Sequence, residues 1–196
     1  MQAERVLSRC RSRTLVLLSD LKGPAQIALV GMPGAGKSSV GRQLAKRLGI
    51  AFADADAVIE HRLNESILSF FEREGEARFR YIEQAVIADL CARPGPMVLA
   101  TGGGAVLREA NRQVLARSAV VVYLHASPDE LYRRLRCDTK RPLLQTADPH
   151  AVLSKMYFER DPLYRQISRF LLETGRPTAK ALVEKIVVEL QSSGYL

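Results

Sequence analysis

The sequence predicts an α/β fold with a parallel sheet, and three observations support this prediction. Five short apolar runs, expected to be buried strands, occur at 27–30, 50–54, 97–101, 120–124 and 169–173. Helix-forming stretches separate most of these runs, which is the pattern of parallel strands joined by helical crossovers. The chain has 196 residues, of which 47% are hydrophobic and 26% charged, and this suits one globular domain with a sizeable core.

Residues 1–24 precede the first strand and form a basic extension that we expect to be flexible. It contains four arginines and only two acidic residues: Arg5, Arg9, Arg11, Arg13, Glu4 and Asp20. An organellar transit peptide has this composition, but we favour a tail that docks nowhere or a start codon placed upstream. Residues 25–196 are then expected to form a single domain.

The first strand leads into GMPGAGKS at 31–38, which fits the pattern G-x-x-x-x-G-K-[ST]. Loops of this kind wrap backbone N–H groups around phosphate oxygens, and glycine permits the close approach. The next residues place Val40, Leu44 and Leu48 on one helical face before a stop at Gly49. Because strand, loop and helix occur in the required order, we expect a nucleoside triphosphate here, and not a turn without a ligand.

The loop pattern also indicates a role for its side chains. Lys37 is expected to reach the β- and γ-phosphates, while the Ser38 hydroxyl is expected to bind Mg²⁺. The nucleotide-binding residues predicted in this loop are Gly34, Ala35, Gly36, Lys37, Ser38 and Ser39.

The second strand ends in two carboxylates, Asp54 and Asp56, within "AFADAD". A parallel sheet presents catalytic groups at the carboxyl edge of its strands, although a helix cap or a solvated carboxylate would give the same pattern. Many P-loop enzymes have a magnesium-binding acid after the strand that "MVLAT" represents, but here the chain continues with TGGG. The chain thus departs from the commoner P-loop layout, and the magnesium-binding acid must come from another strand.

The longest stretch without a strand, 57–93, is predicted to be mostly helical and to form a substrate-binding subdomain. Apolar residues recur at spacings of three, four and four and so form one helical face: Phe79, Ile82, Val86 and Leu90. Arg80 and Glu83 lie off this face and are neighbours on the helix surface, because they are three residues apart.

Four further features follow the third and fourth strands. Gly102, Gly103 and Gly104 would let the backbone approach a small ligand, although a flexible turn is the alternative. Ser127-Pro128-Asp129-Glu130 has the form of a capping box, and Asp148-Pro149 resembles another helix start. Between them, residues 134–148 are polar, basic and poorly periodic, as expected of a mobile lid that excludes water.

Charge and cysteine content exclude several classes of function. The 29 Lys and Arg residues against 21 Asp and Glu give a net charge of +8. This charge is dispersed and lacks interleaved aromatics, so we favour anionic small substrates over nucleic acid. The cysteines are odd in number and far apart, which argues against a disulfide framework or a zinc site and favours the cytoplasm. No apolar run approaches the roughly eighteen residues that a membrane-spanning helix needs, so no membrane partner is expected.

Together the motifs resemble those of the shikimate kinase family, over about residues 26–190 and in the family's order. The residues that carry the resemblance are GMPGAGKS, DAD at 54–56, FRYIE at 79–83, GGG at 102–104, RPLL at 141–144 and ERDPLY at 159–164. The resemblance implies a three-layer α/β/α P-loop kinase with a five-stranded parallel sheet in the order 2-3-1-4-5. It also implies that ATP phosphorylates the 3-hydroxyl of shikimate, in the biosynthesis of chorismate and aromatic amino acids.

The resemblance assigns roles to matched positions around the acceptor. Asp54 would help to position Mg²⁺, and Asp56 would contact the substrate hydroxyl as candidate general base. Arg80 and Arg160 would bind the shikimate carboxylate, with Glu83 orienting Arg80. A planar guanidinium suits that task because it offers two parallel hydrogen bonds. The remaining substrate-binding positions are Phe71, Gly102, Gly103 and Gly104.

On the nucleotide side, the resemblance implies three further arginines. Arg141 in the lid would be catalytic, because it neutralises charge on the transferring phosphoryl group. Arg134 would lie near the nucleotide, and Arg176 in "ETGRPTA" would flank the adenine.

Two alternative functions remain at this stage. A gluconate-kinase-like enzyme would share the loop and the lid but would not require the FR..E, GGG and RDPLY motifs. A non-catalytic nucleotide-binding protein would be expected to lack Lys37, Asp56 or Arg141, and all three are present. The expected protein is a monomer whose partners are ATP and shikimate.

Overall fold

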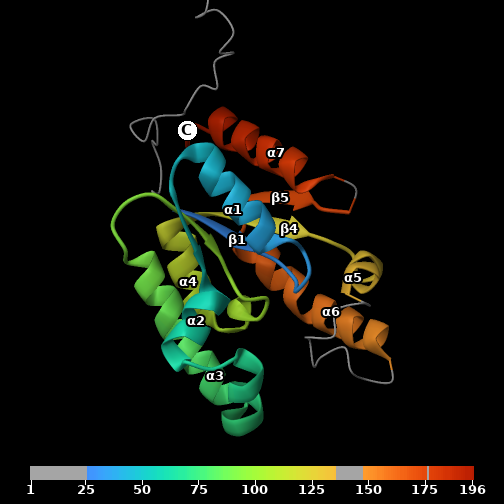
Figure 1. The fold of residues 1–196 in the computed structure, drawn as a ribbon. Coiled ribbons are helices and arrows are strands. Elements are labelled where there is room, and N and C mark those ends of the chain that lie inside the picture. Colours follow the sequence, from blue (N-terminus) through green and yellow to red (C-terminus); the bar gives the residue numbers. More distant parts are fainter. Residues whose placement is uncertain (1–25, 136–147, 176) are drawn as a thin grey trace, which may run out of the picture.

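The computed structural model describes residues 26–135, 148–175 and 177–196, and these form three layers (Figure 1). The central layer is a parallel sheet in the order β2-β3-β1-β4-β5, which confirms the predicted fold and strand order. Its strands are β1 (Gln26–Val30), β2 (Ala51–Asp54), β3 (Met97–Ala100), β4 (Ala119–His125) and β5 (Phe170–Glu173). Every predicted strand is therefore present, with its bounds shifted by at most one residue.

Helices cover both faces of the sheet. They are α1 (Lys37–Leu48), α2 (Ala55–Leu63), α3 (Ile67–Cys91), α4 (Glu109–Ser118), α5 (Pro128–Leu135), α6 (Pro149–Ile167) and α7 (Ala179–Ser192), with a short 3₁₀ turn, η2 (Ala105–Leu107). Helices α1 and α7 pack side by side on one face, while α4 and α6 pack on the other (Figure 1). Within the described residues, no helix is long and apolar enough to cross a membrane.

Burial differs between the central and the edge strands. All residues of β1, β3 and β4 are buried, as expected for strands covered on both faces. The prediction of burial was wrong for β2 and β5, where only Ala53 and Leu172 are buried. Each of these edge strands has one neighbouring strand, so the helical layers cover them less completely.

The helix boundaries follow from local signals in the sequence. Helix α1 ends at Gly49, which has a left-handed φ of 70°, and Val40, Leu44 and Leu48 are buried as predicted. The capping box before α5 is confirmed, because the Ser127 N–H donates to Glu130 Oε2 at 3.0 Å and the Glu130 N–H to Ser127 Oγ at 3.3 Å. Asp148 accepts from the Ala151 N–H at 2.9 Å and so caps α6.

The predicted helical insertion consists of α2 and α3. Phe79, Val86 and Leu90 are buried and Ile82 is partly buried, which confirms the predicted apolar face. Gly75 interrupts α3 with φ 77° and ψ 170°, so the segment consists of a helix at 67–74 and another at 76–91. Only glycine adopts this backbone conformation readily.

Replacing Gly75 by alanine should therefore lower the free energy of unfolding by about 1 to 3 kcal/mol. An added Cβ would meet no atom within 4 Å, so the loss would come from the backbone alone. Urea unfolding monitored by circular dichroism would measure it. Gly95 has φ 88° and equally open surroundings, so Gly95→Ala provides a comparison outside the insertion. An unchanged midpoint for Gly75→Ala would mean that the helix break relaxes without strain.

Several predictions fall outside the described residues. The extension at 1–24 lies there, as do Arg141, Arg176 and most of the predicted lid. Of the stretch 134–148, Arg134 and Leu135 belong to the last turn of α5, and Asp148 is the cap of α6. The division into an extension and a single domain at 25–196 stays a prediction.

Candidate active site

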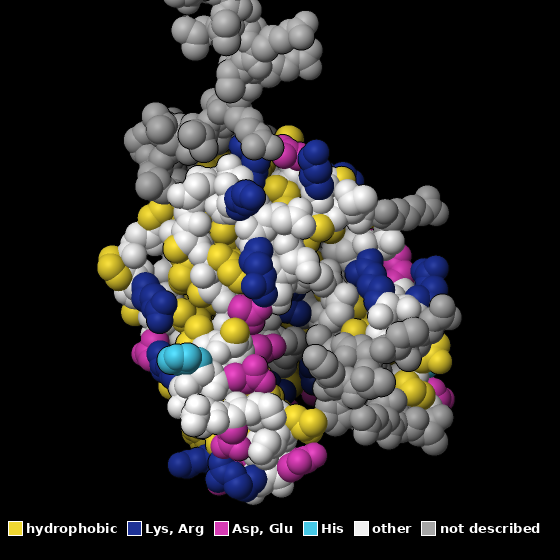
Figure 2. Space-filling view, in the orientation of Figure 1, with side chains coloured by type: hydrophobic (Ala, Val, Ile, Leu, Met, Phe, Trp, Pro, Cys, Tyr) yellow, Lys and Arg dark blue, Asp and Glu magenta, His cyan; other side chains and the backbone are white. Residues whose placement is uncertain are grey.

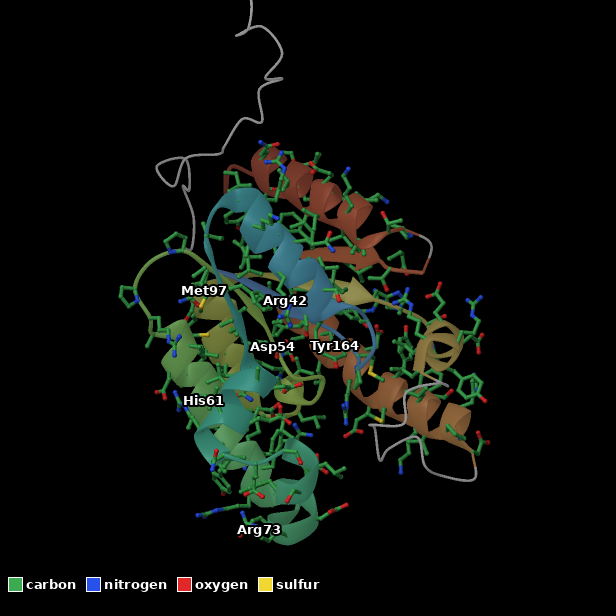
Figure 3. The ribbon with its side chains drawn as sticks, viewed as in Figure 1. Arg42, Asp54, His61, Arg73, Met97 and Tyr164 are labelled. Carbon is green, nitrogen blue, oxygen red and sulfur yellow. The ribbon has the colours of Figure 1, made fainter. Side chains whose placement is uncertain are left out.

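The predicted site residues gather at the carboxyl edge of the sheet. Asp54 pairs with Ala100 in the register of β2 and β3, and Leu29 of β1 pairs with the same Ala100 on its other side. The three segments that follow these strands, 31–36, 54–56 and 101–104, therefore begin side by side. Figure 3 shows Asp54 at this edge, and Figure 2 shows the surface hollowed beside the α2–α3 part, with basic and acidic side chains at the margin.

The loop after β1 is folded around the Lys37 ammonium. Gly34 and Gly36 have positive φ values of 82° and 93°, as the loop pattern requires. Lys37 is buried at the start of α1, and its Nζ donates to the carbonyl oxygens of Gly31 at 2.9 Å and Met32 at 3.0 Å. The charge is thus fixed over the loop and not extended into solvent. Ser38 follows in the first turn of α1 and is half-buried, while Ser39 is exposed.

Asp54 and Asp56 begin α2, and the suggested helix cap is indeed present. Asp54 Oδ1 accepts from the Asp56 N–H at 3.2 Å. This bond engages one carboxylate oxygen and is compatible with a second ligand. A hydroxyl from Ser38 and a carboxylate from Asp54 are the oxygen donors that Mg²⁺ prefers, and Mg²⁺ takes its other ligands from phosphate and water. Within the described residues, no group of three His, Cys, Asp or Glu side chains could hold a metal ion by itself.

The glycine triplet contacts three parts of the site. A Cβ on Gly102 would lie 2.7 Å from both Asp56 Oδ1 and Glu83 Oε1, and one on Gly103 would lie 2.6 Å from Pro33 Cδ. A Cβ on Gly104 would collide with the Arg80 guanidinium. None of the three has a positive φ, so close approach, and not backbone freedom, requires glycine here. The triplet joins the phosphate-binding loop to Asp56 and Arg80.

Arg80 is held by two carboxylates. Its Nη1 donates to Glu83 Oε2 at 2.7 Å, while its Nη2 and Nε donate to Glu76 Oε1 at 2.7 and 3.1 Å. The guanidinium carbon lies 5.3 Å from the centre of the Phe79 ring. Burial lowers the pKa of Arg80, but the ion pairs with Glu83 and Glu76 more than reverse this effect and leave the pKa raised. Arg80 is therefore a fixed positive charge.

Glu83 is the buried acid of the site. Burial raises its pKa, and the neighbouring Asp56 raises it further, whereas Arg80 and Arg160 oppose the shift. Its Oε2 accepts from Arg80, but its buried Oε1 has no hydrogen-bond partner among the described residues. Such an unsatisfied atom is costly and typical of sites that bind ligands or water.

Arg160 reaches the site from α6. Its side chain is buried, and its Nη1 donates to the carbonyl oxygen of Gly103 at 3.3 Å. The Tyr164 hydroxyl, one helical turn later, donates to the same oxygen at 2.5 Å. The buried Nε of Arg160 has no partner in the part of the chain that the structure describes. Arg160 therefore has a donor available for a bound anion.

Polar contacts with β4 fix the position of α6. The Tyr123 hydroxyl donates to Asp161 Oδ1 at 2.8 Å, and the Arg165 Nε donates to Asp161 Oδ2 at 2.7 Å. His125 Nε2 lies 2.8 Å from the Tyr157 hydroxyl, on the same helix. Since Asp161 directly follows Arg160 in α6, these contacts hold the part of the helix that carries Arg160.

Two other predicted residues lie at the margins of the site. Arg134 Nη1 donates to Thr174 Oγ1 at 3.1 Å and to the Gly34 carbonyl oxygen at 3.4 Å, so it connects the phosphate-binding loop with the segment after β5. Phe71 packs on Phe79, with ring centres 4.5 Å apart, and the guanidinium of Arg80 also lies over the Phe79 ring. Arg141 and Arg176 are outside the described residues.

The sequence reasoning missed Glu76, Tyr164 and Pro33. Glu76 is four residues before Arg80, and Tyr164 is four residues after Arg160 within the quoted ERDPLY motif. Helical spacing could have indicated both neighbours. The contact of Pro33 with Gly103 joins residues far apart in sequence, and no local pattern indicates it.

Comparisons with known proteins show which family the chain resembles. The shikimate kinase family model matches residues 33–191. A shikimate kinase of Paracidovorax citrulli (strain AAC00-1) is 50% identical over 178 residues, which cover 89% of this chain and 97% of that protein. The structure of shikimate kinase from Acinetobacter baumannii in complex with shikimate is 40% identical, with a TM-score of 0.85, covering 89% of this chain and 97% of the other. A gluconokinase from Sinorhizobium meliloti 1021 is 21% identical, with a TM-score of 0.57 and coverage of 87% and 97%, so the two proteins share a fold.

Proposed function

The chain belongs to the shikimate kinase family, and on this premise we propose how its own residues divide the work of the reaction. The enzyme transfers the γ-phosphoryl group of ATP to the 3-hydroxyl of shikimate, giving shikimate 3-phosphate and ADP. The single observation that best supports our assignment is the glycine triplet. Its contacts with Pro33, Asp56 and Arg80 place the phosphate-binding loop, a carboxylate and a cation around one small space.

Binding of the acceptor is assigned to the two arginines. We propose that Arg80 and Arg160 bind the shikimate carboxylate, because both are held at the glycine triplet and Arg160 keeps an unpaired donor among the described residues. A guanidinium recognises a planar carboxylate through paired hydrogen bonds, which a lysine cannot reproduce. Glu83 orients Arg80 through their 2.7 Å contact. Phe71 is proposed to close this side of the acceptor site.

Asp56 is proposed to accept the proton of the reacting hydroxyl. Its carboxylate faces Gly102 and lies near Glu83, on the acceptor side of the phosphate-binding loop. Such a base contributes by removing the proton as the new O–P bond forms. Most of the remaining rate enhancement in phosphoryl transfer comes from positioning and from positive charge, which Lys37 supplies at the loop.

The residues also fit a magnesium ion. Ser38 and Asp54 would hold it, and a bound Mg²⁺ would neutralise charge on the β- and γ-phosphate oxygens. Gly34, Ala35, Gly36 and Ser39 would complete the contacts to the phosphates. Arg134 is proposed to lie beside the nucleotide, as are Arg141 and Arg176. The lid role of 134–148, the monomeric state and the cytoplasmic location stay predictions.

A coupled assay of ADP release tests the overall proposal. Purified enzyme with Mg·ATP is given shikimate, gluconate or no acceptor in parallel. We expect ADP release to depend on shikimate. ADP release with gluconate would favour a gluconate-kinase-like enzyme. No ADP release with any acceptor would favour a nucleotide-binding protein without catalysis.

Replacing Arg80 or Arg160 by lysine should weaken shikimate binding by at most about 2 to 5 kcal/mol, the range for truncating one partner of a desolvated charge pair. The positive charge remains, but the paired hydrogen bonds are lost. Titration calorimetry in the presence of ADP would measure the affinity. The nucleotide affinity should hardly change.

The control uses a shikimate analogue that lacks the carboxylate, because each arginine should lose its effect on that ligand. Arg108→Lys provides a matched control variant. The Arg108 guanidinium carbon lies 4.0 Å from the centre of the Tyr81 ring, and its Nη1 donates to Gln84 Oε1 at 3.0 Å. Neither contact involves a residue proposed for the site. If the losses from the arginine and from the carboxylate simply add, the two groups do not interact and the assignment fails.

A further inference from the structure

The contacts of Arg80 leave little room for another carboxylate. A guanidinium has two edges at which a carboxylate can accept two parallel N–H bonds, Nε with Nη2 and Nη1 with Nη2. Glu76 Oε1 occupies the first edge, with 2.7 Å to Nη2 and 3.1 Å to Nε. Glu83 Oε2 bonds Nη1 of the second edge at 2.7 Å. Both edges are thus engaged by carboxylates of the protein itself.

The carboxylates of Glu76 and Glu83 differ in how easily they can move away from Arg80. The Glu83 side chain is 1% exposed, whereas that of Glu76 is 58% exposed. Moving Glu83 would require a rearrangement of buried surroundings, whereas the mostly exposed Glu76 side chain has solvent beside it into which it can rotate. The edge formed by Nε and Nη2 is therefore the one that an incoming anion can take.

The position of Glu76 follows from the break in α3. Gly75 has φ 77° and ψ 170°, and the second part of the helix starts directly after it. Glu76 is therefore in the first turn of that helix, where a negative side chain is favourable, and four residues before Arg80. No other residue of the site is needed to hold it there.

We propose that Glu76 is an internal competitor for the substrate: it occupies Arg80 while the acceptor site is empty, and the carboxylate of shikimate displaces it. This inference rests on the proposed role of Arg80 as a carboxylate ligand. Between turnovers Glu76 keeps the half-buried guanidinium paired and oriented, and an unpaired charge there would be unfavourable. The cost of displacing Glu76 therefore offsets part of the attraction between Arg80 and shikimate.

Glu76→Gln tests the competition, because the amide keeps the shape and can still accept one hydrogen bond but carries no charge. We expect shikimate to bind about two- to fivefold more tightly, since exposed ion pairs are worth at most about this much. Titration calorimetry with ADP present would measure the dissociation constant. Glu76→Ala should change it in the same direction, and thermal unfolding of both variants would show that the fold is retained.

Glu74→Gln provides a matched control. Glu74 is also acidic and close to Gly75, but it pairs with Arg73 at 2.5 Å. Figure 3 shows Arg73 at the outer end of α3, away from Asp54 and the site. This variant should leave the affinity for shikimate unchanged, which excludes a general effect of removing a negative charge from the insertion.

Two further measurements separate this inference from the proposed function. In an Arg80→Ala background, which removes the cation, Glu76→Gln should no longer tighten binding, and an analogue without the carboxylate should not respond to Glu76→Gln at all. Weaker or unchanged binding of shikimate by Glu76→Gln would overturn the competition and leave Arg80 as a ligand. If Arg80→Lys itself has no effect on shikimate affinity, the proposed function of Arg80 fails instead.

Discussion

Lys37→Ala is expected to lower turnover about 10³-fold or more while the fold survives, because a fixed positive charge at the transferring phosphoryl group is lost. In the structure, the carbonyl oxygens of Gly31 and Met32 hold the ammonium over the loop. These two hydrogen bonds hold the positive charge at the loop. Its removal should affect phosphoryl transfer far more than it affects shikimate binding.

ADP release under saturating Mg·ATP and shikimate would measure this loss, and thermal unfolding would report on the fold. Lys46→Ala is a suitable control, since Lys46 lies in the last turn of the same helix and is exposed. It should keep the turnover of the parent. Near-parental turnover of Lys37→Ala with unchanged unfolding would rule out the proposed role.

Asp56→Asn should reduce turnover by about 10²- to 10⁴-fold, the contribution that general-base catalysis typically makes. The substitution keeps the shape of the side chain but removes its capacity to take a proton. It also removes one negative charge beside the buried Glu83, so we do not expect a loss of stability. Binding of Mg·ATP should be nearly intact.

The matching variant Asp54→Asn separates the two carboxylates. It should weaken the binding of Mg·ATP, and saturating nucleotide should restore part of the turnover. The opposite pattern, with retained turnover and weak Mg·ATP binding in Asp56→Asn, would exchange the two assignments. Both variants should be compared at the same free Mg²⁺ concentration, because the proposed metal contact lies on Asp54.

Much of the fold could be predicted because its signals are local. The strands are short apolar runs, α1 has its apolar face at helical spacing, and Ser127 and Glu130 sit at the separation of a capping box. The strand order came only from the resemblance. The exposure of β2 and β5 was not predicted, because apolar runs in edge strands look like those in central strands.

The sequence indicates candidate residues for the site, but it does not indicate most of their contacts. Arg80 and Glu83 are neighbours on one helix, so their ion pair could be expected from spacing. The contact of Arg80 with Gly104, and the shared bonds of Arg160 and Tyr164 to Gly103, depend on how α3 and α6 pack against the segment after β3. Such contacts arise from tertiary structure and leave no periodic signal in the sequence.

The crowding around Gly102, Gly103 and Gly104 also limits how this enzyme could evolve. A Cβ at each position would collide with a different neighbour. Gly102 faces the acids Asp56 and Glu83, Gly103 faces the loop residue Pro33, and Gly104 faces the Arg80 guanidinium. A side chain gained at any of them would need a compensating change in a separate element, and each of those elements already has a task in the site. Adaptation to a larger acceptor is therefore easier through exposed positions of α3 than through the triplet, where every added side chain would collide with a neighbouring segment.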